Sequence, residues 1–261
     1  MKALAELDPR AVRAVLFDID DTLTTAGKLT AQAYAALERL QAAGKLAVAV
    51  TGRPAGWCDH IARMWPLDAV VGENGAFYFL LSHGRLQKQY RDPAEARARN
   101  REQLAKIAQD ILAAVPGCAI AADQAYRETD LAIDYCEDVP PLPLAAAERI
   151  AALMRQAGLH AKLSSIHVNG WFGDYDKLTM TRALFREQFA MDLDGDRDAV
   201  IYIGDSPNDA PMFEFFPKSV GVANVQRFAG ALPAEPKYIT GASSGAGFAE
   251  VVAHLLGLSS T

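Results

Sequence analysis

The sequence is poor in cysteine, and no apolar run reaches the roughly 18 to 20 residues that a membrane-spanning helix needs. The three cysteines are widely spaced and form no CxxC pair, which argues against a disulfide framework and against a zinc site. The N-terminal segment lacks the apolar stretch of a secretory signal. We therefore expect a cytoplasmic protein with reduced, mostly buried thiols and no membrane partner.

Basic residues are also too few for a typical nucleic-acid-binding protein. The 26 lysines and arginines are outnumbered by 32 aspartates and glutamates, which gives a net charge of −6. A basic surface is the usual footprint on a phosphate backbone, so we expect no nucleic-acid partner. The five histidines show no HxxxH spacing, which disfavours a histidine-based metal centre. What is present is an ordinary globular composition, 51% hydrophobic and 22% charged, over 261 residues.

Apolar runs and amphipathic segments alternate in the first third of the chain. This rhythm predicts strands and helices in turn, with strands at 14–17, 46–50 and 69–71 and helices over 31–43 and 54–65. Thr30 fits the N-cap of the first helix and Gly44 its end. Strands that are separated by helices in this way form a parallel sheet.

The rhythm changes in the middle third and then resumes. The middle predicts a hairpin at 77–81 and 85–90, helices over 94–114 and 145–157, and strands at 118–122, 131–135, 160–165 and 166–172. After it we expect a helix over 177–190, strands at 199–203, 219–222 and near Tyr238, and a helix over 246–256. The predicted fold is α/β: a doubly wound parallel-sheet core from residues 1–88 and 173–261, with an inserted α+β unit at 89–172.

Residues that can bind a ligand through polar side chains or backbone groups follow four of the predicted core strands. They are Asp18 with Asp20, Thr51 with Gly52, Asn74, and Asp205 with Asn208 and Asp209. In an open parallel sheet, ligands bind beyond the carboxyl ends of the strands, so we expect these groups to converge. Converging carboxylates, together with a phosphate and water, are what Mg²⁺ prefers. The clustering therefore predicts a magnesium and phosphate site.

The spacing within these segments allows a division of roles. In Asp18-x-Asp20 one carboxylate can act as a nucleophile and the other as acid and base. Thr51 and nearby backbone N–H groups can bind phosphate oxygens, and Lys177 can orient Asp18 and offset developing charge.

Each of these features has a simpler interpretation when it is taken alone. An acidic pair often caps a helix or turn, an exposed arginine such as Arg53 often forms a weak surface ion pair, and Asn74 before a glycine either stabilises a turn or contacts substrate. His167, Asn169 and Trp171 alternate along one predicted strand and share a face. They either line a substrate pocket or serve only packing within the inserted unit.

Taken together, the segments resemble the four motifs of the haloacid dehalogenase superfamily in their proper order. They are FDIDDTL at 17–23, TGR at 51–53, Lys177, and GDSPND at 204–209. The insertion lies between ENGA at 73–76 and Lys177, which resembles the type IIB members with a Cof-type cap. GDSPNDAPMF at 204–213 looks most like the mannosyl-3-phosphoglycerate phosphatase branch, a neighbour of the sucrose-phosphate and trehalose-phosphate phosphatases. Asp21 stands where many relatives have glycine, and we expect it to point away from the site or to cap a turn.

The resemblance implies a Mg²⁺-dependent phosphatase that acts on a small phosphorylated metabolite, best expected to be a sugar or glycosyl phosphate such as mannosyl-3-phosphoglycerate. Asp18 would form an aspartyl phosphate and Asp20 would act as acid and then as base. Mg²⁺ would be held by Asp18, Asp205 and the backbone carbonyl of Asp20, and Asp209 would complete the metal site. The residues expected to bind substrate are Gly52, Arg53, Asn74, Ser206 and Asn208.

Other functions fit fewer of these residues, with one exception. A phosphomutase of the same fold stays open, and a requirement for a sugar bisphosphate activator would reveal it. A dehalogenase would leave Asp20 without a role. A phosphorylated receiver module is disfavoured because its phosphoacceptor lies on a middle strand, whereas the acidic pair comes first in this chain. A binding protein without catalytic activity is disfavoured because every residue type that the chemistry requires is present. The sequence fits either a monomer or a homodimer.

Overall fold

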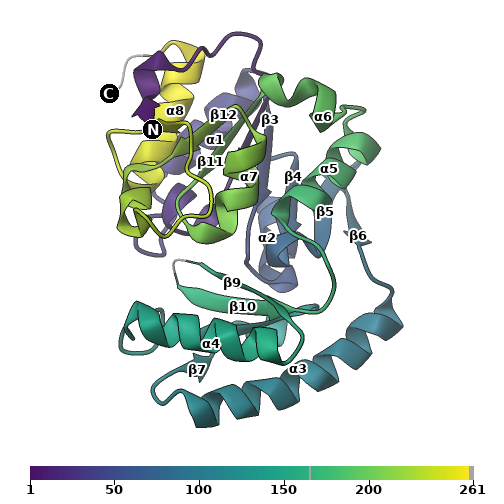
Figure 1. The fold of residues 1–261 in the computed structure, drawn as a ribbon. Helices are drawn as coiled ribbons and strands as arrows, with labels where there is room; N and C mark the ends of the chain where they lie inside the picture. Colours follow the sequence, from purple (N-terminus) through teal and green to yellow (C-terminus); the bar gives the residue numbers. More distant parts are fainter. Residues whose placement is uncertain (165, 259–261) are drawn as a thin grey trace.

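The computed structural model describes residues 1–164 and 166–258, and its larger part is built on a nine-stranded sheet of order β1-β13-β12-β11-β2-β3-β4-β5-β6 (Figure 1). The strands are β1 (Lys2–Ala3), β2 (Ala14–Phe17), β3 (Leu46–Val50), β4 (Ala69–Gly72), β5 (Phe77–Ser82), β6 (Arg85–Tyr90), β11 (Val200–Gly204), β12 (Lys218–Gly221) and β13 (Tyr238–Ile239). Every pair from β1 to β4 is parallel, whereas β5 and β6 are antiparallel. The strands predicted to be parallel are so, and the predicted hairpin makes the sheet mixed because it pairs with the open edge of β4.

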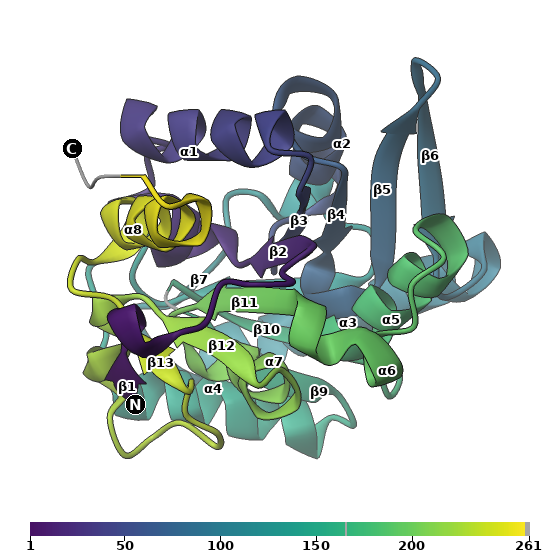
Figure 2. The same ribbon diagram turned by 90° about the horizontal axis from the view of Figure 1, so that it is seen from above.

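Helices cover both faces of this sheet (Figure 2). One face carries α1 (Ala31–Ala42), α2 (Ala55–Met64) and α8 (Ser244–Leu256), and the other carries α5 (Lys177–Gln188), α6 (Leu193–Asp196) and α7 (Ala210–Phe215). Successive strand residues point to opposite faces, so Val15 and Phe17 pack in one apolar core and Leu16 packs in the other. The expected cap of the first helix is present, since Thr30 Oγ1 accepts a hydrogen bond from the Ala33 N–H. The double cover confirms the expected α/β fold.

A second, four-stranded sheet of order β7-β8-β10-β9 lies across from the carboxyl ends of the core strands (Figure 1). It consists of β7 (Ala119–Ile120), β8 (Asp130–Asp134), β9 (His160–Leu163) and β10 (His167–Trp171), and all its pairs are antiparallel. Helices α3 (Ala94–Ala114) and α4 (Leu144–Gln156) pack on its far face against residues such as Ile133 and Val168. We call these strands and helices the smaller layer. The other face of the four-stranded sheet, which carries His167 and Asn169, faces the larger sheet.

Most elements form close to where the periodicity predicts them. The expected strand at 118–122 is reduced to β7, and the one expected at 160–165 ends at Leu163, with residue 165 outside the described residues. The short elements β1, α6 and α7 were not predicted, because two to six residues are too few to show a period. None of the helices in the two described ranges is long and apolar enough to cross a membrane.

Candidate active site

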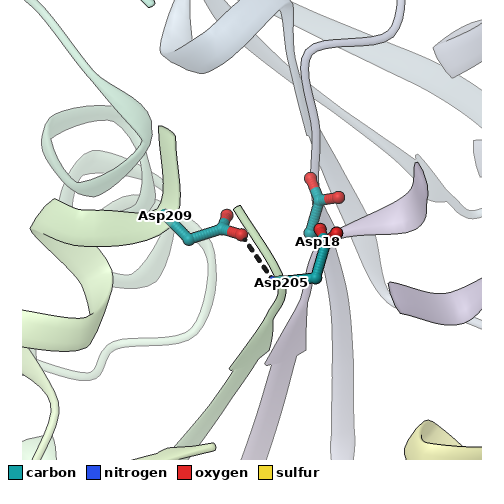
Figure 3. Close-up of side chains that lie close together, drawn as sticks. All are labelled: Asp18, Asp205 and Asp209. Atoms are coloured by element: carbon teal, nitrogen blue, oxygen red, sulfur yellow. Dashed lines mark hydrogen bonds between the residues drawn. The ribbon is translucent and has the colours of Figure 1, made fainter. Parts of the chain in front are cut away.

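The site lies where the chain connections on the two sides of the sheet diverge. Strands β2 and β11 are parallel neighbours, with Phe17 opposite Ile203, and they end directly before Asp18 and within one residue of Asp205. The chain leaves β2 toward β3 on one side, and it leaves β11 toward β12 on the other. Such a switch point opens a crevice between the strand ends. Figure 3 shows Asp18, Asp205 and Asp209 gathered there, with carboxylate oxygens within 4.8 Å of one another.

Lys177, the first residue of α5, brings a positive charge to these carboxylates. Its Nζ donates to Asp18 Oδ1 at 2.6 Å and to Asp209 Oδ1 at 2.7 Å, and the residue is only 1% exposed. Burial disfavours a charged lysine, but the two carboxylates outweigh it and raise the pKa of Lys177 above its ordinary value. The ammonium therefore stays charged at neutral pH and fixes the orientation of Asp18.

Negative charge still exceeds positive charge in this cluster. Burial raises the pKa of Asp18 to about 7, with a further rise from Asp209 that Lys177 partly offsets. Burial, with Asp18 next in effect, also raises the pKa of Asp205 well above its usual range. Among the described residues nothing donates to Asp18 Oδ2, so this oxygen is open to a ligand. Oxygen donors with excess negative charge suit a hard divalent cation such as Mg²⁺, and the residues present fit that ion.

Asp209 accepts more hydrogen bonds than Asp18 or Asp205 does. Its Oδ1 accepts from Lys177 and from the Tyr202 hydroxyl, and its Oδ2 accepts from the backbone N–H groups of Asp205 at 2.9 Å and Ser206 at 3.1 Å. The two bonds to Oδ2 tie the loop after β11 to the Asp209 carboxylate. Asp209 thus holds Lys177 and Asp205 in place from within the acidic cluster.

Asp20 lies apart from the cluster and is paired with Arg53. The guanidinium donates to both Asp20 oxygens, at 2.8 to 3.0 Å, and also to Glu137 at 2.7 Å and Asp123 at 3.4 Å. Burial opposes the charge, but Asp20 and then Glu137 raise the pKa of Arg53. Arg53, expected to bind substrate, therefore links Asp20 on the core to acidic groups on the smaller layer.

The remaining predicted residues lie at three strand ends beside the same crevice. Thr51 Oγ1 accepts from the Arg53 N–H at 3.0 Å, which leaves its hydroxyl proton available to a phosphate oxygen. Asn208 Nδ2 donates to Asn74 Oδ1 at 3.2 Å, and Ser206 donates to Asn208 Oδ1 at 2.8 Å. The Asn74 side-chain nitrogen is buried and has no partner among the described residues. Asn74 also forms the turn: its φ is 55°, and its backbone N–H donates to the Thr51 carbonyl. Both the turn-forming and the substrate-binding interpretation of this residue therefore retain support.

Asp21 adopts the left-handed conformation, with φ 55°, and its charge is compensated locally. Its carboxylate is 3.1 Å from the guanidinium of Arg227, which also lies 3.3 Å from Asp205. Asn224 donates both to the Asp21 carbonyl and to Asp205. Sequence reasoning missed Asn224 and Arg227, because their short 3₁₀ segment carries no motif.

The smaller layer closes directly over these groups. A narrow cavity of about 10 Å³ lies between the layers and is lined by Asp18, Asp20 and Arg53 on one side and by Arg127, His167 and Asn169 on the other, together with Gly52, Ser164, Ile166, Ser206 and Asn208. Of the three alternating strand residues, His167 and Asn169 thus line the site, whereas Trp171 is buried and stacks on Tyr175.

Buried polar groups fasten the loop of residues 123–129 in the smaller layer to the core. Arg127 donates to the Gly52 carbonyl at 2.9 Å and pairs with Asp123 and Asp130. Glu73 accepts from the N–H groups of Ala55, Glu128 and Thr129, at 2.7 to 2.9 Å. The sequence offered no signal for the contacts of Arg127 with Gly52 and of Glu73 with residues 128 and 129, since these partners are distant along the chain.

Comparison with known proteins agrees with this geometry. The family model of haloacid dehalogenase-like hydrolases matches residues 15–124 and 177–251, well over half of the chain. The chain belongs to this family. The match to the haloacid dehalogenase-like hydrolases contains the core residues of the site, from Asp18 to Asp209. No curated protein sequence matches the chain significantly.

Three solved structures illustrate the shared fold. A Thermoplasma acidophilum protein is 17% identical with a TM-score of 0.70, and the alignment covers 94% of this chain and 98% of that one. The sucrose-phosphatase of Synechocystis, solved with sucrose and phosphate, is 17% identical with a TM-score of 0.63, over 94% and 98% of the two chains. The C-terminal domain of C. albicans trehalose-6-phosphate phosphatase is 14% identical with a TM-score of 0.68, over 95% and 93%.

Proposed function

We propose that the protein is a Mg²⁺-dependent phosphatase that hydrolyses a small phosphorylated metabolite, a sugar or glycosyl phosphate, through an aspartyl phosphate on Asp18. The observation that carries this proposal is the buried contact of Lys177 with Asp18 and Asp209 beside Asp205, at the switch point of the sheet. Similar folds in a sucrose-phosphatase and a trehalose-6-phosphate phosphatase domain support the substrate class. The motif at 204–213 favours the mannosyl-3-phosphoglycerate and sucrose-phosphatase branch of the type IIB group.

In this proposal the two aspartates divide the chemistry. The Asp18 carboxylate attacks phosphorus, the bond from phosphorus to the leaving oxygen breaks, and Asp20 gives that oxygen a proton. Asp20 then takes a proton from the water that attacks the aspartyl phosphate, which releases phosphate and restores Asp18. Arg53 holds the Asp20 carboxylate through its paired donors, so the acid keeps one orientation in both steps.

Other residues provide binding and charge. Lys177 orients Asp18, and Thr51, Gly52, Asn74, Ser206 and Asn208 surround the phosphoryl oxygens. Asp18, Asp205 and the Asp20 backbone carbonyl would hold Mg²⁺, with Asp209 supporting them, and the ion would neutralise phosphate charge. Residues 89–172 act as a cap on the core of residues 1–88 and 173–261. Since the cavity that borders Asp18 is only about 10 Å³, the cap must open to admit substrate and close to exclude water.

Phosphate release from a panel of metabolites tests the proposal. The panel contains mannosyl-3-phosphoglycerate, trehalose 6-phosphate, sucrose 6-phosphate, hexose phosphates and acetyl phosphate, each with Mg²⁺ and with EDTA. We expect metal-dependent release by the wild type and by Asp110→Asn, which changes an exposed aspartate on α3, and no release by Asp18→Asn. Release that persists in Asp18→Asn would overturn the assignment. Isomerisation that requires a sugar bisphosphate would instead identify a phosphomutase.

A further inference from the structure

The leaving group of the proposed reaction needs a space that reaches Asp20. An acid must lie within hydrogen-bond distance of the oxygen that it protonates, so the body of the leaving group lies next to that carboxylate. The cavity that borders both Asp18 and Asp20 offers about 10 Å³, roughly the space of one water molecule. It cannot hold a sugar.

A second cavity borders Asp20 and has the required size. It measures about 440 Å³, within the roughly 300 to 1,000 Å³ of small-molecule sites. Besides Asp20 and Arg53, its walls include Trp57, His60, Trp65 and Tyr126. We call it the Trp57 pocket, and we propose that it binds the leaving group as a sugar ring stacked on these aromatic side chains. The inference rests on the proposed function and names the site that selects its substrate.

The side chains of the Trp57 pocket suit a ring with apolar faces and polar edges. Trp57 is 42% exposed and Tyr126 is 57% exposed, so part of each side chain is accessible to a ligand. The Arg53 guanidinium lies 4.4 Å from the centre of the Trp57 ring and fixes its orientation beside Asp20. A sugar ring presents C–H faces to such rings, while His60, Arg53 and Asp20 can hydrogen-bond its hydroxyl groups.

Tyr126 belongs to the smaller layer and completes the pocket only when the layers meet. A Cβ atom at position 56 would lie 2.9 Å from Tyr126 Cβ, so Gly56 allows this tyrosine to approach the start of α2. The loop that carries Tyr126 is fastened by Arg127 on the Gly52 carbonyl and by Glu73 on two backbone N–H groups. A sugar bound against both walls would therefore favour the closed arrangement in which Asp18 is shielded from water.

A larger cavity elsewhere does not meet the chemical requirement. It measures about 830 Å³ and lies between α4, β9 and the segment near Phe228. Its walls include His160, Lys162 and Pro207, and none of Asp18, Asp20 or Lys177 borders it. A leaving group held there would not lie beside Asp20.

Substrate selectivity tests the pocket. The variants are Trp57→Ala and Tyr126→Ala, both at exposed positions. The control is Met64→Ala, which lies on the same helix as Trp57 and is 63% exposed. The readout is the ratio of kcat/KM for trehalose 6-phosphate or glucose 6-phosphate, whichever the wild type hydrolyses faster, to kcat/KM for acetyl phosphate. We expect this ratio to fall about tenfold in Trp57→Ala and severalfold in Tyr126→Ala, and to stay at the wild-type value in Met64→Ala.

Binding measured without turnover separates the two proposals. Saturation-transfer NMR with free trehalose and with glucose 6-phosphate should show sugar contact that weakens in Trp57→Ala and persists in Asp18→Asn. Asp18-dependent phosphate release with an unchanged ratio in both aromatic variants would overturn the pocket and leave the phosphatase intact. Trp57-dependent sugar binding without Asp18-dependent release would support the pocket and overturn the phosphatase. A loss in Trp57→Ala confined to 4-nitrophenyl phosphate would show an aryl ligand and overturn the sugar assignment.

Discussion

Replacing Lys177 by methionine removes the ammonium that lies between Asp18 and Asp209 and leaves their carboxylates buried without it. Both carboxylates are within 2.7 Å of Nζ, and Lys177 is 1% exposed. Removing one partner of a buried ion pair costs about 3 to 5 kcal/mol, because the other charge stays buried and uncompensated. We expect Lys177→Met to lower the free energy of unfolding by about that amount near neutral pH.

The loss should depend on pH in a defined direction. The pKa of Asp18 is about 7 in the fold, above its usual 3.8, because of burial. Protonation therefore favours the folded state: the stability that Asp18 contributes is complete below 3.8 and is lost as the pH rises through about 7. Lys177 lowers this pKa, so without it the penalty for an ionised Asp18 increases. The defect should be largest above about pH 7 and smallest near about pH 5.

Urea unfolding in EDTA, followed by circular dichroism at several pH values, measures this effect. The exposed Lys106 on α3 gives the matched control, and Lys106→Met should change stability by less than about 0.5 kcal/mol. Adding Asp209→Asn to Lys177→Met should recover part of the loss, since it removes one of the stranded charges. A loss below about 1 kcal/mol, or one that does not vary with pH, would refute the reasoning.

Two further substitutions test the packing and the contact between the layers. Gly75→Ala would place a Cβ 2.1 Å from the Asp176 carbonyl oxygen and displace the start of α5, so urea unfolding should show a loss of about 2 to 3 kcal/mol. Gly84→Ala, also at positive φ but with nothing within 4 Å of its Cβ, should lose only about 1 kcal/mol, and equal losses would contradict the clash. Glu137 has its pKa lowered to about 2, because His167 and Arg53 outweigh partial burial. The stability that ionised Glu137 contributes is therefore present above pH 4.5 and is lost as the pH falls toward 2. In a thermal unfolding series, Glu137→Gln should cost about 1 kcal/mol at neutral pH and less below about pH 4.5.

The sequence was informative where local pattern determines structure. The runs at 14–17 and 46–50 are apolar throughout and end at polar motifs, so both strands and their role as site positions could be predicted. The parallel strands and the hairpin were both predicted, but the pairing of the hairpin with β4 was not, because it depends on which edge of the sheet is open and not on the hairpin's own residues.

The residue types that gather at the site could be predicted, but most of their hydrogen-bond and ion-pair partners could not. Lys177 is 159 positions from Asp18, and only the order of the motifs suggested that the two meet. The contacts of Arg53 with Glu137, 84 positions away, and of Arg227 with Asp205 depend on how loops meet in space. No spacing rule encodes them, so the link between Asp20 and the smaller layer emerged only from the structure.

The most direct test of phosphoryl transfer through Asp18 is to trap the covalent intermediate. Asp20→Asn should slow hydrolysis of the aspartyl phosphate, because it removes the base that activates water. After this variant is mixed with Mg²⁺ and acetyl phosphate, whose carboxylate leaving group needs no acid, and is quenched in acid, mass spectrometry should find one phosphoryl group on the peptide that contains Asp18. A phosphoryl group on a different residue, or none in Asp20→Asn while phosphate is released at the wild-type rate, would contradict the account.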